Sequence, residues 1–382
     1  MTLVQRRNVL SAFAASMLAF AAGASSAQEL VIGAPLAMTG PAGQVSADVV
    51  KGAQLAIDEV NAAGGVLGRK LKLEVQDTTG APAQAVQLVG SFARNPNVIA
   101  ILGPINAAEV GAVTGLAASN KIVVYAPASA GTVPGVPDLK FNEWTFRLNQ
   151  AQPTVLGPLV NQVAAISKAK SITILNYSDN GAYVDAGNLW QKTAEGKGMT
   201  VQRIQFPSAT QDFSAIVTQI KKDTQLVGIG ALSGTLGPLI RAIRQAGINA
   251  PIMGDASILA ASVFTVSQGA SKGAYSYSSY LSGAGTGTNE FIAGFKKAHN
   301  ADPSAIASYG YEAVKLIANA LKTQKAVTRQ ALRDGLGKTR GYKGITGDVS
   351  YNNSGDAVRQ SVPLVQVGDN GELKKVGDIK LQ

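Results

Sequence analysis

The sequence contains no cysteine and only one histidine, His299. Without cysteine the chain cannot form disulfide bonds or thiolate zinc sites. A single histidine leaves little from which to build the Ser-His or Cys-His pairs that activate a nucleophile. These absences point away from hydrolytic chemistry and toward binding.

Charged residues are also scarce, at 15% of the 382 residues, whereas hydrophobic residues make up 46%. A chain with this much apolar side chain and so little charge can bury a core, which excludes intrinsic disorder. The 42 glycines follow no three-residue period, which excludes a collagen-like rod. The length is sufficient for two hydrophobic cores, and we expect a compact α/β protein.

The N-terminus has the order of an export signal. Arg6 and Arg7 precede a mainly apolar run over 9–22, which the small residues Gly23–Ala27 follow. The run has 14 residues, fewer than the roughly 20 that a membrane-spanning helix needs. We therefore expect a signal peptide over 1–27, cleavage near Ala27 and release into the periplasm. The arginine pair leaves both general secretion and twin-arginine export open.

The formal net charge is +10, and cleavage after Ala27 removes two arginines and no acidic residue, which leaves +8. The lysines and arginines are scattered in pairs, without a longer basic run or interleaved aromatic residues. This pattern predicts a solvated basic surface and no nucleic-acid partner.

Short β-branched runs alternate with helical stretches in two successive series. Such alternation predicts right-handed crossovers and parallel sheets, and two series predict two doubly wound α/β domains. In the first helix Val49, Ala53, Ala56 and Val60 lie on one face. The predicted strands are 30–34, 71–75, 98–102, 122–126, 172–175, 201–204, 226–231 and 252–254.

Three further segments organise the rest of the chain. A polar and aromatic stretch over 141–152 would serve as a crossing between the two domains. Helices are predicted over 289–299 and 304–321, after a glycine-rich loop. The tail over 346–367 reads as strands joined by a turn at 352–356. Ligands of open α/β sheets bind beyond the carboxyl ends of strands, so we expect the site between the domains.

A set of short motifs, in their order and spacing, resembles the periplasmic solute-binding proteins of branched-chain amino-acid ABC transporters, the leucine/isoleucine/valine-binding type. The resemblance covers the whole chain after the signal. The motifs are Leu36–Pro41, Asn61–Arg69, Asp77, Leu102–Pro104, Ala126–Ser129, Phe146–Arg147, Asp179–Tyr183, Tyr311–Val314 and Gly344–Tyr351.

The resemblance implies a type I periplasmic binding protein fold, with two doubly wound parallel-sheet lobes joined by three hinge crossings. Lobe 1 would comprise 28–148 and 281–344, and lobe 2 would comprise 149–280 and 345–382. The implied function is capture of a small solute between the lobes and delivery to an ABC permease. We expect a monomer that is not an enzyme and has no cofactor and no metal.

The resemblance also places a ligand pocket on this sequence. Backbone N–H groups and hydroxyls of two lobe 1 loops would hold a ligand carboxylate. Tyr183 and Leu232 would face the ligand from lobe 2, and Asp255 would pair with a ligand ammonium unless that acid is lost at Ala256. The lobe 1 loops are represented by Asn106, Ala107, Ala128, Ser129 and Ala130, and Tyr309 is a further candidate contact.

This pocket departs from the family pattern. Ala107 and Ala130 stand where a serine and a threonine are usual, and Leu232 replaces an aromatic residue. These changes make the pocket less polar, so two ligand classes stay open. One is a branched-chain or other hydrophobic amino acid, and the other is a related aromatic or aliphatic carboxylate.

The sequence also suggests two enzyme interpretations and one binding alternative. Gly228, Gly230 and Gly234 with Asp255 mimic a dinucleotide-binding motif, but the glycine spacing is wrong, and packing explains them better. The stretch 230–234 is one residue out of register with the serine-hydrolase motif G-x-S-x-G, and His299 is expected at a solvated helix end. A ligand-sensing receptor of the same fold is the remaining alternative.

Overall fold

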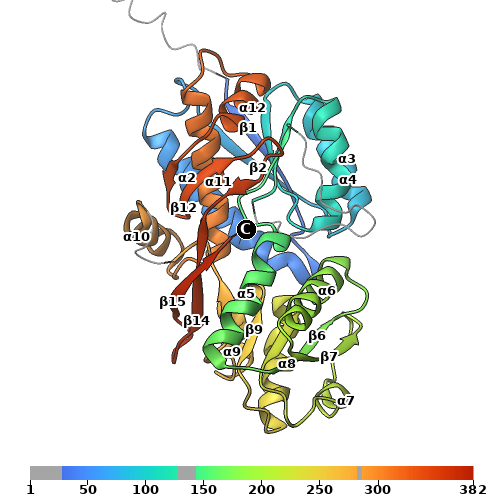
Figure 1. Cartoon of the computed structure of the whole chain (residues 1–382). Helices are drawn as coiled ribbons and strands as arrows, with labels where there is room; N and C mark the ends of the chain where they lie inside the picture. Colours follow the sequence, from blue (N-terminus) through green and yellow to red (C-terminus); the bar gives the residue numbers. More distant parts are fainter. Residues whose placement is uncertain (1–27, 128–142, 282–285, 382) are drawn as a thin grey trace, which may run out of the picture.

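The computed structural model describes residues 28–127, 143–281 and 286–381. Figure 1 shows two α/β lobes, one above the other, with the last strands of the chain running beside the junction. Each lobe is built on its own sheet, and a smaller third sheet lies with the first. The predicted α/β class is confirmed.

The first sheet has five parallel strands in the order β2-β1-β3-β4-β5. All seven residues of β1 are buried because helices cover both faces, which explains its continuous apolar sequence. The predicted strands of this series are confirmed to within about two residues, and β5 is an addition. The strands are β1 (Leu30–Leu36), β2 (Leu71–Asp77), β3 (Val98–Leu102), β4 (Val123–Tyr125) and β5 (Thr145–Phe146).

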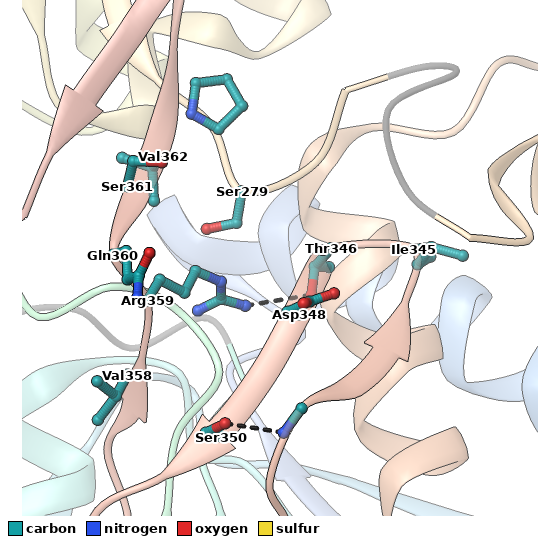
Figure 2. Close-up of a pocket in the computed structure, with 13 residues that line it drawn as sticks. Ser279, Ile345, Thr346, Asp348, Ser350, Val358, Arg359, Gln360, Ser361 and Val362 are labelled. Atoms are coloured by element: carbon teal, nitrogen blue, oxygen red, sulfur yellow. Dashed lines mark hydrogen bonds between the residues drawn. The ribbon is translucent and has the colours of Figure 1, made fainter.

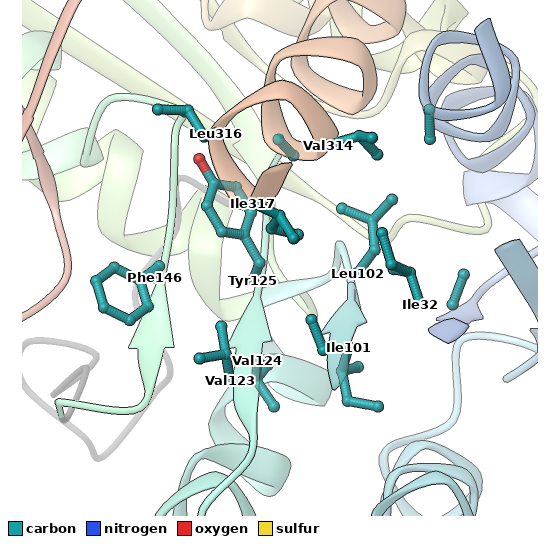
Figure 3. Close-up of a cluster of buried hydrophobic side chains, with 14 of the residues drawn as sticks. Ile32, Ile101, Leu102, Val123, Val124, Tyr125, Phe146, Val314, Leu316 and Ile317 are labelled. Carbon is teal, nitrogen blue, oxygen red and sulfur yellow. The ribbon is translucent and has the colours of Figure 1, made fainter. Parts of the chain in front are cut away.

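Helices from both ends of the chain cover this sheet. They are α2 (Gly43–Ala62), α3 (Pro82–Arg94), α4 (Ala107–Ser119), α10 (Thr288–His299), α11 (Ala305–Lys322) and α12 (Arg329–Gly337), with the short helix η2 (Gly40–Ala42) before α2. In Figure 3 apolar side chains of β3 and β4 gather beside those of α11, among them Leu102, Tyr125 and Ile317. The C-terminal helices therefore share the core of the first lobe.

Helices α2 and α11 pack backbone to backbone through two glycines. A Cβ at Gly52 would lie 1.9 Å from the carbonyl oxygen of Ala307, and one at Gly310 would lie 2.1 Å from that of Val49. Only glycine permits such a close approach. The contact joins the N-terminal part of lobe 1 to α11, which belongs to the segment that returns to lobe 1 from lobe 2.

The second sheet has seven strands in the order β15-β14-β10-β9-β8-β6-β7. Strands β6 to β10 are parallel, whereas β14 is antiparallel to both β10 and β15. The predicted four-strand parallel series is thus extended by β10 and an antiparallel pair. The strands are β6 (Ser171–Tyr177), β7 (Thr200–Phe206), β8 (Val227–Gly230), β9 (Ile252–Gly254), β10 (Tyr275–Tyr277), β14 (Ser361–Val367) and β15 (Leu373–Lys380).

The helices of this lobe are α5 (Gln152–Ser167), α6 (Gly181–Gly196), α7 (Ser214–Val217), α8 (Ser233–Gln245), η3 (Ala256–Leu259) and α9 (Ala261–Val266).

Glycines in β8 make room for a tryptophan. Trp190 of α6 is fully buried, and its ring would lie 3.5 Å from a Cβ at Gly228 or Gly230. The packing interpretation of these two glycines is confirmed.

The third sheet consists of β11 (Tyr342–Gly344), β12 (Gly347–Tyr351) and β13 (Ala357–Val358). Tyr351 packs edge-on against Phe146, with ring centroids 5.2 Å apart, and its hydroxyl is hydrogen-bonded to that of Tyr125. Val349 and Ala357 belong to the same core as the first sheet. We propose that lobe 1 continues to about Val358 and that the predicted boundary at 344/345 moves to this point.

The chain passes between the lobes three times, near 149–151, 278–279 and 359–360. The turn before β13 binds the first crossing: the backbone N–H of Arg147 donates to Gly355 O at 3.0 Å, and the Arg147 side chain forms an ion pair with Asp356. Arg359 of the third crossing donates to Leu148 O at 2.9 Å. The first and third crossings are therefore hydrogen-bonded to one another.

No helix within the described residues is long and apolar enough to cross a membrane. The predicted signal over 1–27 lies outside those residues. His299 ends α10 as expected, but its ring is half-buried against Phe295 at 4.5 Å between centroids. It is therefore packed more closely than a solvated residue.

Candidate functional site

The topology brings Asn106 and Ala107 to one edge of the first sheet, and Tyr183, Leu232 and Asp255 to one edge of the second. Strand β1 lies between β2 and β3, so the chain leaves β1 toward one side of the sheet and leaves β3 toward the other. In lobe 2, β6 has the same position between β7 and β8. Beyond the carboxyl ends of the strands at such a point the loops diverge, which is where open α/β sheets bind ligands.

The lobe 1 wall is formed by the start of α4. Asn106 is the N-cap residue with an extended backbone, and Ala107 is the first helical residue; both are half-buried. The methyl group of Ala107 packs against Val110 and Ala126. The first N–H groups of a helix lack intrahelical acceptors and favour an anion, so this wall suits a carboxylate. The predicted residues Ala128, Ser129 and Ala130 lie outside the described residues.

Asp77 fixes the neighbouring loops of this wall. Its carboxylate accepts hydrogen bonds from Met38 N at 2.9 Å, Thr39 Oγ1 at 2.8 Å and Thr79 N at 2.7 Å. The hydrogen bond from the Thr79 backbone is the main reason why the pKa of Asp77 is lowered. The loops that follow β1 and β2 are thereby held together.

Glu109 is a buried acid of this wall that the sequence interpretation missed. Its side chain is fully buried in the third position of α4, and neither carboxyl oxygen makes a hydrogen bond of normal geometry. Burial raises the pKa of Glu109, while the adjacent side chains of Thr78 and Asn106 oppose the shift. The pattern Asn-x-x-Glu at a helix start, which is typical of a capping box, could have drawn attention to it.

The lobe 2 wall brings together Tyr183 and Asp255, which are 72 positions apart in the sequence. Tyr183 lies in the first turn of α6 and is 6% exposed, with its ring edge-on to Tyr177. Its hydroxyl lies 3.5 Å from Ser257 Oγ. Ser257 N in turn donates to Asp255 Oδ1 at 3.0 Å. The predicted tyrosine and the predicted acid therefore share one surface.

Asp255 is a buried carboxyl group without a cation. It is 8% exposed, and the ion pairs among the described residues include none with Asp255. Burial raises the pKa of Asp255 to about 6, against hydrogen bonds from Ser257 that lower it. At neutral pH this group is mostly ionised, and a positively charged partner would stabilise it.

The other two predicted residues lie at different places. Leu232 is the N-cap residue of α8, half-buried and packed against the core of lobe 2. Tyr309 of α11 is fully buried at the hinge, where its hydroxyl donates to Asn149 Oδ1 at 3.3 Å. The structure thus groups Asn106 with Ala107 and Tyr183 with Asp255, and puts Tyr309 beside the crossings.

Tyr277 is a second residue that the sequence interpretation missed. It ends β10 and is 1% exposed. Burial raises the pKa of Tyr277, and the negative charge of nearby Asp255 raises it further. Its position at the carboxyl end of a strand was the available signal, but β10 itself was not predicted.

A separate hollow of about 440 Å³ lies at the hinge (Figure 2). Its walls include Ser279, Thr346 and Arg359, and none of the predicted ligand residues. For metals the described residues offer no site, because no three His, Cys, Asp or Glu side chains are grouped suitably.

The sequence matches the periplasmic binding protein family over residues 29–372. It is 26% identical to the Leu/Ile/Val-binding protein BraC3 of Rhizobium johnstonii, over 93% of this chain and 95% of that protein. Two solved structures show the same fold. The branched-chain amino acid transporter substrate-binding protein LivJ of Streptococcus pneumoniae, in complex with isoleucine, has a TM-score of 0.83 at 21% identity and covers 93% of this chain and 99% of its own.

The second structure is a solute-binding protein of an ABC transporter from R. palustris in complex with benzoate. It has a TM-score of 0.80 at 16% identity and covers 92% of this chain and 97% of its own. Together with the two-lobed fold and the grouping of residues at the strand ends, these findings show that the chain belongs to the periplasmic binding protein family.

Proposed function

We propose that this protein captures a hydrophobic α-amino acid of the leucine, isoleucine or valine type between its lobes and delivers it to an ABC permease. The observation that carries the proposal is Asp255, a buried acid with no cationic partner among the described residues. An ammonium group of the ligand supplies the missing charge.

The two walls suit the two charged groups of an amino acid. The ligand carboxylate binds the free N–H groups at Asn106 and Ala107 in lobe 1. The ammonium lies at Asp255 in lobe 2, near Tyr183 and Tyr277, and Leu232 offers apolar surface to the ligand side chain. This division of contacts means that both lobes are needed for tight binding.

The remaining expectations follow from the family and the N-terminal sequence. We infer export to the periplasm with cleavage near Ala27, a monomeric state, the permease subunits as partners, and binding without catalysis or a cofactor. The relatives named as amino-acid-binding proteins support transport over the sensing alternative.

Calorimetry with a panel of ligands tests the proposal. The panel contains L-leucine, L-isoleucine, L-valine, benzoate and 4-methylpentanoate, which is leucine without its amino group. We expect the amino acids to bind at least about 30-fold more tightly than 4-methylpentanoate, because only they place a charge on Asp255. Equal affinity for leucine and its deaminated analogue would overturn the amino-acid assignment.

An aromatic carboxylate is the second candidate. It is favoured by the methyl group of Ala107, which packs against Val110 and Ala126 where a hydroxyl would be more polar, and by the rings of Tyr183 and Tyr277. The benzoate complex shows that the fold accommodates such a ligand. Benzoate binding that exceeds leucine binding in the same panel would establish this class instead.

Ligand binding should close the lobes. The three crossings are short, so a few backbone dihedrals can change the angle between the lobes, and a ligand that contacts both walls favours the closed state. Small-angle scattering should therefore give a smaller radius of gyration at saturating leucine than without it. An unchanged radius, with binding shown by calorimetry, would contradict the hinge mechanism.

Tyr183 and Ser129 test the two walls separately. Ser129→Ala should weaken leucine binding about tenfold, because a hydrogen bond to a charged group contributes on the order of 1.5–3 kcal/mol. Tyr183→Ala should weaken it more than Tyr183→Phe does, since the ring supplies most of the contact area. Calorimetry measures both. Wild-type affinity in all three variants would show that the ligand lies elsewhere.

A further inference from the structure

The hinge pocket of Figure 2 lies outside the proposed amino-acid site and spans parts of both lobes. Its walls come from the second crossing at Ser279, the third crossing at Arg359–Gln360, the β11–β12 hairpin of lobe 1 and the start of β14 in lobe 2. A volume of about 440 Å³ lies within the range of small-molecule sites. A ligand of several heavy atoms fits there.

Ser279 offers this pocket a buried hydroxyl group, whose contact with the Tyr309 hydroxyl is not a hydrogen bond of normal geometry. The residue is only 6% exposed, and its Oγ atom has no hydrogen-bond partner of normal geometry. In Figure 2 the Ser279 side chain lies above the guanidinium of Arg359. A serine hydroxyl can both donate and accept, and a ligand carboxylate placed between Ser279 and Arg359 would accept a hydrogen bond from each. Such a bond would give the hydroxyl a partner of normal geometry in place of its contact with Tyr309.

Arg359 carries a positive charge that the protein balances only in part. Its Nη1 donates to Leu148 O at 2.9 Å and its Nη2 to Thr346 Oγ1 at 3.2 Å, while Nε has no partner. Among the described residues no carboxylate forms an ion pair with it. Each terminal nitrogen retains a second hydrogen, so the guanidinium can still bind an oxyanion.

The nearby acids are engaged elsewhere. Asp348 at the rim of the pocket is paired with Lys343. Glu312 is buried on α11 and accepts a hydrogen bond from Thr346 N at 2.9 Å. Its carboxyl group interacts electrostatically with Arg359 but forms no ion pair with it among the described residues. The space above the guanidinium therefore favours an anion.

The rest of the wall has polar and apolar parts, and its polar side chains include Ser350, Gln360 and Ser361. Ile345, Val358, Val362 and Pro363 line the pocket around the polar groups. An inorganic ion would leave the exposed surface of Val358 and Pro363 in water, whereas the hydrocarbon part of an organic acid would cover it. We propose that the hinge pocket is a second binding site, which takes a small organic acid with its carboxylate on Arg359 and Ser279.

Such a ligand contacts the segments that move relative to one another during closure. If its affinity differs between the open and the closed state, its binding is coupled to that of the amino acid by the same factor in both directions. The site would thus adjust the affinity of the main cleft.

The experiment measures hexanoate and inorganic phosphate binding by calorimetry on the full mature chain. We expect hexanoate to bind at millimolar concentration or below, and more tightly than phosphate. Ser279→Val and Arg359→Gln should each weaken hexanoate binding at least about tenfold. The matched control is Arg340→Gln, because Arg340 also makes two hydrogen bonds, both to backbone carbonyls, but does not line the pocket.

Asp255→Asn and Tyr183→Ala serve as cleft controls and should leave hexanoate binding unchanged. Loss of hexanoate binding in these variants alone would place the acid in the main cleft and overturn the proposal. Absence of hexanoate binding at millimolar concentration, or wild-type binding in Ser279→Val, would also overturn it. Ser279→Val keeps the test valid if Arg359→Gln fails to fold. Leucine binding is measured in parallel, so failure of the amino-acid assignment is recognised separately.

Coupling is tested by titrating leucine with and without saturating hexanoate. We expect the leucine affinity of the wild-type protein to change by at least about threefold and that of Ser279→Val to stay the same. An unchanged affinity in the wild type would show that the pocket binds without influencing closure.

Discussion

Asp255→Asn is expected to weaken leucine binding at least about 30-fold, since removing one partner of a buried charge pair typically costs 2–5 kcal/mol. The buried carboxylate has no cation among the described residues, so we expect the ligand ammonium to be its counter-ion. Binding of 4-methylpentanoate should change less than about threefold, because this analogue lacks the ammonium group. Calorimetry of both ligands with both proteins gives a double-mutant cycle, which isolates the interaction between Asp255 and the ligand ammonium group. A similar loss for both would mean that Asp255 acts on the shape of the pocket and not on charge.

The same residue predicts how binding depends on pH. Because burial raises the pKa of Asp255 to about 6, the group loses its charge as the pH falls through 6. The leucine affinity should then fall by up to about tenfold per pH unit in the wild type and remain level in Asp255→Asn. Glu109 and Asp77 of the opposite wall titrate in both proteins, so the difference between the two curves isolates Asp255.

The free energy of unfolding of the ligand-free protein should rise as the pH falls, whereas the leucine affinity falls. The pKa of Asp255 in the folded state lies above its ordinary value of 3.8, so the folded state binds this proton more tightly than the unfolded state does. Protonation therefore stabilises the fold as the pH falls from about 6 toward 4. Urea unfolding should show this contribution in the wild type and not in Asp255→Asn. Identical pH dependences of the two proteins would contradict the raised pKa.

Trp190→Ala is expected to lower the free energy of unfolding of lobe 2 by about 3–5 kcal/mol. The tryptophan is fully buried between α6 and the glycines of β8, where no neighbouring side chain can fill its place without a large shift. Urea unfolding followed by circular dichroism measures the effect. The same cavity lies next to Tyr183, whose ring would contact a Cβ at Gly230, so leucine affinity should fall as well.

Trp190→Phe is the matched control. The indole Nε1 has no hydrogen-bond partner, so this change removes volume but no polar contact. It should cost clearly less than Trp190→Ala, on the order of 1–2 kcal/mol. Equal costs for the two variants would show that the packing against β8 is not what makes this position important.

Much of the fold could be predicted from the residue pattern. Strands such as β1 and β3 are buried on both faces and therefore read as continuous apolar runs, and α2 shows its buried face at Val49, Ala53, Ala56 and Val60. Gly64 and Gly65 end that helix region with φ of 91° and 76°, values that favour glycine. These features depend on neighbours in the sequence, which is why the sequence alone reveals them.

β10 and β15 were not predicted from the sequence, for different reasons. β10 has only three residues and little apolar pattern. β15 is an edge strand with mostly exposed residues, including Lys374 and Lys375, so its sequence lacks a buried face. That the tail over 342–358 packs with lobe 1 depends on Tyr351 meeting Phe146, a contact between residues far apart in the chain.

The sequence by itself determined the α/β class, the two successive series and the strand ends at which Asn106, Ala107 and Asp255 stand, because these follow from local periodicity and from residues at turns. Only the tertiary structure decided that Asp255 lies near Tyr183 with no cationic partner among the described residues, that Glu109 is buried, and that Ser279 and Arg359 line one pocket at the hinge. Burial and unsatisfied hydrogen bonding arise when distant segments exclude water together, and no local pattern encodes them.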